Sequence, residues 1–379
     1  MTLEETQLPT LDLLRQLTDT HVVDQLLLNP ELTRAEISAR TGISKPTISE
    51  SVRRLEAAGL LTESGQQQGR RGRAGTFYRL RDDAGVALAM SAGPDGMIVE
   101  TCDLRGTVVD RIEREVPSPA DSATLNPIMS ETVTEAVTQA RGPIRAWALS
   151  LAGPVDQVSG RLVQLPNSPF LLDELRPREL IGSLASPLLQ VDNDVNWAAL
   201  AEHHQGNARD LVHFCYCYLG PGLGTALVSS GVVVHGDRGL AGELAHVRTT
   251  GPGGRSLRLV ECFDAWDLLH PGSNAIDVAR LVDLLESPLA AHRRVRDEVV
   301  QAVAGAICSI TALFNPEGVI IGGPWSGATG FEHELAERVH SEAAIDTEVR
   351  LSALDAGAPL AGARLQAVRS AQSALLPRS

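Results

Sequence analysis

The chain has 379 residues, of which 43% are hydrophobic and only 3% are aromatic. This length exceeds one ordinary domain, so we expect two or three. The sequence holds no run of 18 or more apolar residues and no signal-peptide pattern, which predicts a soluble, cytoplasmic protein that does not enter a membrane. Its five cysteines are scattered and odd in number, which favours reduced thiols over a disulfide framework.

The net charge of −14 argues against nucleic-acid binding by the chain as a whole. The charge is uneven, however, because residues 33–80 hold nine Lys or Arg and four acids, a net charge of +5. The remainder therefore carries −19. A basic N-terminal module on an acidic body is typical of a DNA-binding domain joined to a domain with another task.

Residues 10–28 form the first predicted helix, because apolar residues recur there at helical spacing. A short second helix starts at a capping box made by Thr33 and Glu36. It ends at Gly42, where a tight turn needs a residue that tolerates positive φ. Ser44 then caps a third helix.

The third helix has two different faces. Ile48, Val52 and Leu55 form a stripe that we expect to be buried. The outward face is polar and basic, and it consists of Ser44, Lys45, Thr47, Ser49 and Arg53. A helix, a Gly turn and a helix of this kind predict a helix-turn-helix, whose second helix enters the DNA major groove. The alternative is a small helical bundle with an ordinary solvated face.

Two strand-like segments, residues 60–65 and 76–80, flank a loop rich in Gly, Gln and Arg. After a helix-turn-helix, this pattern predicts a winged helix, and the boundary of the module is placed at residues 1–82. The loop contains Arg70, Arg71 and Arg73, and Arg is attracted to narrow minor grooves. The predicted partner is a double-stranded DNA operator, bound with strong salt dependence.

In residues 83–379 the pattern changes to apolar strands alternating with helices. Three strands are predicted within residues 85–116, and further buried strands are predicted near 146–155, 187–191, 212–220 and 319–323. Predicted helices lie around 124–140, 194–205, 258–269, 293–314 and 331–342. This is the pattern of an α/β body, which we expect to form two lobes.

One strand of this body ends in Asp192-Asn193-Asp194 and continues into a helix. In α/β proteins ligands bind at the carboxyl ends of strands, so these side chains are candidates for a binding site. Asn193 could instead serve only as the cap of the helix that follows.

The sequence resembles the repressors of the ROK family (repressor, open reading frame, kinase), which join a winged helix to a sugar-kinase-like body. The resemblance covers nearly the whole chain and is carried by these motifs: GISKPTISESVRRLEAAGLL, GRRGRAGTFYRL, LAGPVD, VDNDVNWAALAE, LGPGLGTALVSSGVVVHGDRGLAGELAHV and FNPEGVIIGG. It implies a two-lobed actin-like ATPase (ribonuclease H-like) fold with a sugar bound between the lobes.

The resemblance also implies which residues would contact the sugar: Asn167, Asn193, Asp194, Glu243, His246 and Glu261. Carboxylates accept hydrogen bonds from hydroxyls, and Asn and His both donate and accept, so the set suits a polyol. For Glu261 the alternative is an ordinary surface residue. Asp194 stands where a sugar kinase would hold the base that deprotonates the sugar hydroxyl.

The positions that would hold a nucleotide depart from the kinases of the family. The stretch that aligns with their Asp-x-Gly-Gly-Thr loop is residues 91–95, in which Ser91 replaces the Asp and Pro94 replaces a Gly. In the second phosphate loop Pro221 stands where a Thr is usual. Phosphoryl transfer depends on such donors, so we expect no kinase activity and no catalytic residue.

Many relatives also carry three Cys after the His of the Gly-Glu-x-x-His motif, and with that His these bind structural zinc. The aligned residues here are Pro252, Gly254 and Leu259, and His246 alone cannot hold the metal. The sequence therefore predicts neither metal nor cofactor, and it leaves the local fold of residues 246–260 open.

These observations predict a transcriptional regulator, most simply a repressor, that works as a homodimer or tetramer and responds to a sugar or sugar derivative. Two alternatives remain at this point. One is a functional sugar kinase with an accessory DNA-binding domain, and the other is a regulator that no longer senses a small molecule.

Overall fold

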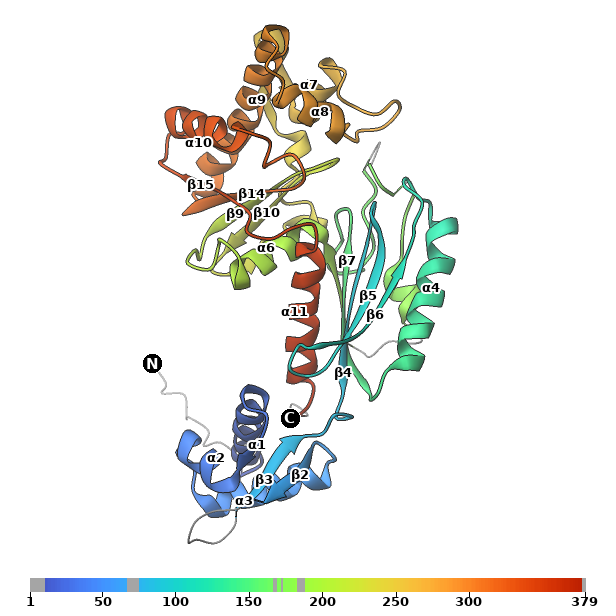
Figure 1. The fold of residues 1–379 in the computed structure, drawn as a ribbon, viewed down its shortest axis with the longest axis vertical. Helices are drawn as coiled ribbons and strands as arrows, with labels where there is room; N and C mark the ends of the chain where they lie inside the picture. Colours follow the sequence, from blue (N-terminus) through green and yellow to red (C-terminus); the bar gives the residue numbers. More distant parts are fainter. Residues whose placement is uncertain (1–10, 67–74, 166–168, 172, 183–187, 377–379) are drawn as a thin grey trace, which may run out of the picture.

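The computed structural model describes residues 11–66, 75–165, 169–171, 173–182 and 188–376. Three parts follow one another along the chain: a small N-terminal module, a first lobe built on one five-stranded sheet, and a second lobe built on another (Figure 1). Two helices, residues 194–205 and 358–373, lie where these parts meet.

The N-terminal module contains three helices and a three-stranded sheet. The helices are α1 (Leu11–Leu28), α2 (Arg34–Thr41) and α3 (Lys45–Ala57), and the strands are β1 (Leu32–Thr33), β2 (Leu61–Gln66) and β3 (Thr76–Leu80). The sheet order is β1-β3-β2 with antiparallel pairs, which is the winged-helix arrangement predicted from the sequence. Ile48, Val52 and Leu55 are buried, as predicted.

Only part of α1 is buried. Leu11, Leu14 and Leu17 are exposed, and the residues that the helix buries are Thr18, Val22, Val23 and Leu26. The apolar spacing identified the helix correctly, but only the second half of α1 packs into the core.

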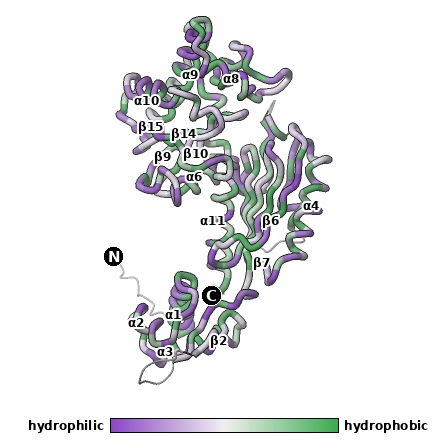
Figure 2. The backbone as a smooth tube through the Cα atoms, in the orientation of Figure 1, coloured by the Kyte–Doolittle hydropathy of each residue, from purple (hydrophilic) through white to green (hydrophobic). Residues whose placement is uncertain are grey.

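The first lobe has the strand order β6-β5-β4-β7-β8. Its strands are β4 (Val86–Gly93), β5 (Gly96–Cys102), β6 (Val108–Arg114), β7 (Ile144–Leu151) and β8 (Leu189–Asn193). Strands β4, β7 and β8 are parallel, so their carboxyl ends share one edge. Helix α4 (Ser122–Gln139) packs beside β5 and β6, with α5 (Pro177–Ile181) next to it (Figure 1). Figure 2 shows both hydrophilic and hydrophobic residues along α4, as expected for a helix with one face on a sheet.

The second lobe has the strand order β11-β10-β9-β14-β15. Its strands are β9 (Phe214–Leu219), β10 (Leu223–Ser229), β11 (Val232–Val233), β14 (Gly318–Gly322) and β15 (Glu348–Leu351). Its helices are α7 (Leu259–Ala265), α8 (Val278–Leu285), α9 (Ala290–Phe314) and α10 (Phe331–Glu342). Within the described ranges, α9 is the one helix long and apolar enough to span a membrane. Core helices of soluble proteins pass the same test, and α9 packs against α8, α10 and β12.

Residues 246–260, whose fold the sequence left open, form a short hairpin. Strand β12 (Arg248–Thr250) pairs with β13 (Ser256–Arg258), and a 3-10 turn (Pro252–Gly254) joins them. The Gly251 N–H donates to the Arg255 carbonyl at 2.8 Å. Backbone hydrogen bonds therefore hold this segment together locally.

Helices α6 (Asp194–Gln205) and α11 (Ala358–Ser373) pack closely against each other at the junction of the lobes. A Cβ atom at Gly362 would lie 1.9 Å from the Trp197 carbonyl oxygen, so only glycine permits this crossing. Neither α11 nor α8, β10 and β15 was predicted from the sequence. The buried side of α11 is mostly Ala and Gly, which gives a weak apolar pattern.

The N-terminal module and the first lobe share one hydrophobic core. Val22 and Leu26 of α1 belong to the same buried cluster as Ala367, Val368 and Ala371 of α11. The Arg105 guanidinium, in the turn between β5 and β6, donates to the carbonyls of Leu26 and Pro30 at 3.1 and 3.2 Å. The module is thus packed onto the body, and the end of α11 lies beside α1 (Figure 1).

Candidate functional sites

The outward face of α3 is built by local capping. Thr33 and Glu36 form the capping box of α2, and Gly42 ends that helix with φ +73°. Ser44 caps α3, where its hydroxyl also bonds to the Thr47 hydroxyl at 2.7 Å. Of the predicted DNA-contacting residues in this helix-turn-helix, Ser44, Lys45, Thr47 and Arg53 are exposed and Ser49 is half-buried. The predicted wing residues Arg70, Arg71 and Arg73 lie outside the described residues.

A clamp that the sequence did not reveal holds α3 against α1. The Asp19 carboxylate of α1 accepts a hydrogen bond from Ser51 at 2.5 Å and from two nitrogens of Arg54 at 2.6 and 3.2 Å. Asp19 is mostly buried, with 15% of its side chain exposed. The orientation of α3 is therefore tied to the orientation of α1.

Asn193 and Asp194 lie where β8 turns into α6 at the lobe junction. The Asn193 side chain accepts the Val195 N–H at 2.8 Å and caps α6, so the capping alternative describes what this oxygen does. Asp194 also accepts the Val195 N–H, at 2.9 Å. Burial, with a smaller effect of the Asp192 charge, raises the pKa of Asp194 to about 7.

Glu243 comes from the second lobe and lies in the electrostatic field of Asp194. Burial raises the pKa of Glu243 to about 7, and the charge of Asp194 adds to this rise. Two carboxyl groups with raised pKa values can offer protonated oxygens as donors and ionised oxygens as acceptors. A sugar with several hydroxyls needs both. His246 ends the 3-10 turn that follows Glu243.

The Glu261 carboxylate is occupied by hydrogen bonds from Arg258. Both of its oxygens accept hydrogen bonds from Arg258, at 2.7 to 2.9 Å, and the pair closes the capping box of α7. These bonds lower the pKa of Glu261. Its contacts are those of the surface alternative, and it joins the sugar set only if Arg258 releases it. Asn167 lies outside the described residues.

A second polar cluster adjoins Asp194; the sequence singled out its Asp192 but not the partners His235, Asn196 and Gln157. Asp192 is 8% exposed, and it accepts hydrogen bonds from His235 at 2.7 Å and from Asn196 at 2.8 Å. Gln157 also donates to it, at 3.3 Å. The Asp192 hydrogen bond raises the pKa of His235. The only signal in the sequence was a His eight residues before Glu243, and its partner is 43 residues away.

The two turns that correspond to phosphate loops lie at the ends of β4 and β9. In the first, Gly93 pairs with Gly96, and the intervening Pro94 and Asp95 are exposed. In the second, the Gly220 N–H donates to the Gly222 carbonyl at 3.1 Å, and Pro221 has no N–H. Tyr218 lies in the fields of both Asp95 and Asp194, which add to the effect of burial in raising its pKa.

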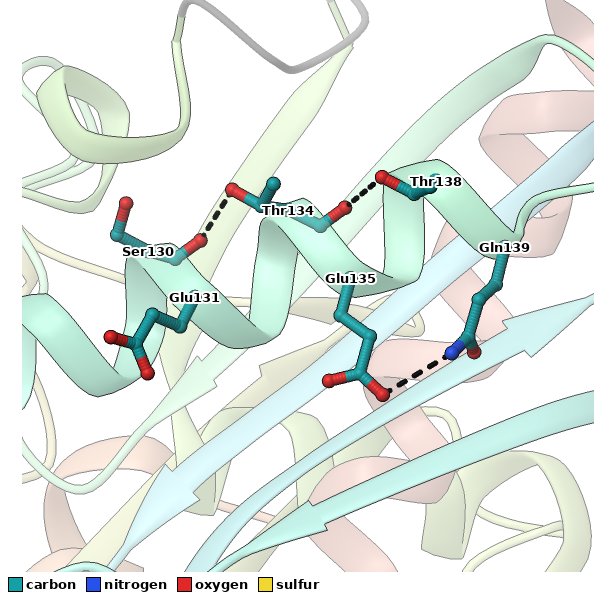
Figure 3. A pocket seen from close by; sticks show the side chains of 6 residues that line it. All are labelled: Ser130, Glu131, Thr134, Glu135, Thr138 and Gln139. Carbon is teal, nitrogen blue, oxygen red and sulfur yellow. Dashed lines mark hydrogen bonds between the residues drawn. The ribbon is translucent and has the colours of Figure 1, made fainter.

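A hollow on the outer face of α4 is a different feature. Figure 3 shows Thr134 and Thr138 bonding to backbone carbonyls of their own helix, and Glu135 bonding to Gln139. The two threonines bond within their own helix, Glu135 also pairs with Arg114 of β6, and α4 lies away from the lobe junction (Figure 1). Among the described residues no group of three or more His, Cys, Asp or Glu is arranged to hold a metal ion.

Comparison with known families agrees with this architecture. Residues 88–262 match the model of the ROK family, and residues 12–72 match the model of the MarR family. The chain carries a ROK family domain behind a MarR-type winged helix domain. Both the winged helix and the sugar-kinase-like, actin-like body predicted from the sequence are thereby confirmed.

Proteins similar to this chain include some named as repressors and some named as kinases. The xylose repressor of Bacillus subtilis is 24% identical over 229 residues, which are 60% of this chain and 59% of that protein. The glucokinase of Thermotoga maritima is 27% identical over 272 residues, which are 64% of this chain and 82% of that protein. The match thus spans about three fifths of the length of the repressor.

Solved structures share the fold. A ROK family transcriptional regulator, a homologue of the E. coli MLC protein, superimposes with a TM-score of 0.68 at 19% identity, covering 96% of this chain and 98% of its own. The ROK hexokinase from Thermus thermophilus gives 0.59 at 24% identity, covering 74% of this chain and 97% of its own. The regulator therefore matches the N-terminal module and the body together, and the hexokinase matches three quarters of the chain.

Proposed function

We propose that this protein is a cytoplasmic transcriptional repressor whose affinity for a DNA operator is set by a sugar or sugar derivative that it binds without phosphorylating. Residues 1–82 bind the operator, and residues 83–379 bind the effector and form a homodimer or tetramer. The DNA contacts are Ser44, Lys45, Thr47, Ser49, Arg53, Arg70, Arg71 and Arg73. The effector contacts are Asn167, Asn193, Asp194, Glu243 and His246, with Glu261 conditional on its release from Arg258. No metal or cofactor takes part.

The observation that carries this proposal is the packing of α11 against both regions. Near its start α11 crosses α6, the helix that begins at Asp194, with Gly362 against Trp197. Near its end, Arg369 and Gln372 face Leu17 and Thr20 of α1 across a hollow. A shift of α6 on sugar binding therefore has a packed route to the DNA-binding module.

Further contacts hold α6 and α11 in place at the junction of the lobes. Glu202 of α6 is fully buried and accepts hydrogen bonds from Ser352 at 2.6 Å and from the Leu354 N–H at 3.0 Å, in the segment that leads to α11. Arg364 of α11 pairs with the buried Glu100 of β5 at 2.7 Å. In the N-terminal module, the hydrogen bond between Arg54 and Asp19 ties α3 to α1. A ligand moves such an equilibrium by its differential affinity for the two arrangements.

The absence of phosphorylation rests on the two turns described above. Pro94 and Pro221 each lack an N–H, and Asp95 adds a negative charge to the first turn. Phosphoryl transfer depends almost entirely on donors and cations that position and neutralise the phosphates. The Asp194 carboxylate then acts as a hydrogen-bond acceptor for a sugar hydroxyl.

The proposal is tested by the substitution Asp194→Ala. Loss of a charge-assisted hydrogen bond costs roughly 1.5–3 kcal/mol, about a tenfold to hundredfold loss of sugar affinity. Operator affinity without sugar stays near wild type, and release by sugar is lost. Operator affinity is measured with and without D-xylose, D-glucose and N-acetylmannosamine, sugars named for relatives of this chain. A mutant released as readily as wild type contradicts the site, and a wild type that responds to none of the three favours a regulator that no longer senses a sugar.

The second candidate is a sugar kinase with an accessory DNA-binding domain. The pKa of about 7 at Asp194, the position of a kinase base, favours it, as does the similarity to glucokinase. The two functions are separated by an assay of ADP release in the presence of each sugar and Mg-ATP. We expect none. Steady ADP release that is lost in Asp194→Asn would establish the kinase.

A further inference from the structure

His235 makes the polar contact that joins the two lobes next to the sugar-binding residues. It follows β11 of the second lobe, and its Nε2 lies 2.7 Å from Oδ2 of Asp192 in β8 of the first lobe. The pair is largely shielded, with 29% of the His235 side chain and 11% of the Asp192 side chain exposed. The contact thus has the burial of a structural bond and lies beside Asn193 and Asp194.

The Asp192 side is rigidly held. Its Oδ1 accepts the Asn193 N–H at 2.7 Å, the Asn196 amide at 2.8 Å and the Gln157 amide at 3.3 Å. Because Oδ1 is occupied by these three donors, Oδ2 is presented in a fixed direction to His235. A fixed acceptor next to the cap of α6 is a suitable anchor for a loop from the opposite lobe.

The segment from His235 to Glu243 is wedged between the lobes. A Cβ atom at Gly239 would lie 1.9 Å from the Val155 carbonyl oxygen of the first lobe, and one at Gly242 would lie 1.8 Å from the Thr225 carbonyl oxygen of the second. The Ala241 N–H donates back to the His235 carbonyl at 3.1 Å, which closes the loop on itself. Such close approaches leave the loop few alternative paths.

We propose that His235 is a positioning residue: its hydrogen bond to Asp192 fixes the loop of residues 235–243 against the first lobe and so places Glu243 opposite Asp194. The inference rests on the proposed sugar-binding function and explains how that site is assembled from two lobes. Without the bond, the loop that carries Glu243 keeps its close approach to the first lobe at Gly239 but loses its hydrogen bond to that lobe. The sugar would then have to order the loop as it binds, which lowers its affinity.

The test combines loop exchange with sugar binding in the full chain. The variants are His235→Ala, His235→Gln, which keeps a donor near the position of Nε2, and the control His213→Ala. His213 is a partly buried histidine bonded to Ser229 at 3.2 Å within the second lobe. Amide hydrogen exchange is followed in residues 236–245, and binding of D-xylose, D-glucose and N-acetylmannosamine is measured by calorimetry.

We expect His235→Ala to speed exchange in residues 236–245 and to weaken sugar binding at least about tenfold, with His235→Gln recovering part of both. The control should change neither. Unchanged exchange in His235→Ala overturns the proposal, and so does faster exchange with unchanged sugar affinity. If wild type binds none of the sugars, the proposed function fails, and the exchange measurement alone still supports or overturns the anchoring of the loop.

Discussion

The N-terminal module and the two-lobed body are held together by contacts of different range. In the module, the turns that present α3 come from neighbours in the chain, such as Thr33 with Glu36 and Ser44 with Thr47. In the body, Asp192 bonds to a residue 43 positions away and Glu202 to one 150 positions away. The face of α3 proposed to bind DNA is therefore set mainly by local structure, whereas the proposed effector site exists only when two lobes are assembled.

The largest effect should come from closing the space at the crossing of α6 and α11. Gly362→Ala places a methyl group against the Trp197 carbonyl oxygen, and a backbone atom cannot turn away as a flexible side chain does. We expect a loss of about 3 kcal/mol in unfolding free energy, at the upper end for overpacking. Denaturant unfolding measures it. The control Gly327→Ala, where no atom lies within 4 Å, should change little.

The same substitution sharpens the comparison between the two regions. If α11 transmits the sugar signal, Gly362→Ala also weakens the effect of sugar on operator binding. The affinity for sugar measured without DNA and the affinity for DNA measured without sugar should change less. An unaltered sugar response together with the lost stability would show that the signal takes another route.

The clamp at Asp19 is a long-range tie within the module. Asp19→Ala leaves Arg54, with 36% of its side chain exposed, without its carboxylate. We expect a loss of about 2 kcal/mol, below the range for fully buried pairs because solvent reaches the arginine. Operator affinity should fall as well, since α3 loses its tie to α1. Asp12→Ala is the matched control in the same helix, because the Asp12–Arg15 pair is exposed. Equal melting temperatures for the two variants would contradict the clamp.

This difference in range explains what the sequence could and could not predict. The caps at Thr33 and Ser44 and the buried stripe of α3 follow from local rules, so the winged helix was predicted closely. Helix α11 was missed because it buries mainly Ala and Gly, which leave no strong periodic signal. His235 was missed because its partner is far away in the chain, and only the fold brings the two together.

The next prediction concerns the arginines of the predicted wing in the N-terminal module. Replacing Arg70, Arg71 and Arg73 by Ala should weaken operator binding on the order of tenfold to hundredfold and lower its salt slope by about 2.7, the value for three lost phosphate contacts. The measurement is operator affinity across a salt titration. The same number of Arg replaced on the second lobe, at Arg280, Arg293 and Arg294, serves as the control. An identical slope in wild type and the wing variant would exclude contact with DNA.

The smallest expected effect concerns the pH dependence of the body. Asp194 and Glu243 have pKa values of about 7 when folded, compared with about 3.9 and 4.3 for unfolded carboxyls. Between about pH 4 and pH 7 the folded state therefore binds more protons than the unfolded state. The stability that these two carboxyls contribute is fully present below pH 4 and is lost as the pH rises to 7. The raised pKa of His235 adds a loss of the same sign. Asp194→Asn removes one titrating group and the charge that raises the pKa of Glu243. Both side chains are half-buried, so solvent weakens the effect of the full pKa shift, and we expect the variant to lose about 1 kcal/mol less than wild type between pH 5 and pH 8, measured as denaturant midpoints.

The control for this pH prediction is Glu261→Gln. The bonds of Glu261 to Arg258 lower its pKa, so its contribution to stability is present at high pH and is lost only as pH falls through the acid range. Between pH 5 and pH 8 the control should therefore follow wild type. A slope flattened equally by Glu261→Gln would show that Glu261 shares the environment of Asp194 and Glu243, and would move it back among the effector contacts. A slope unchanged in Asp194→Asn would show that Asp194 does not titrate in this range and that its charge does not raise the pKa of Glu243.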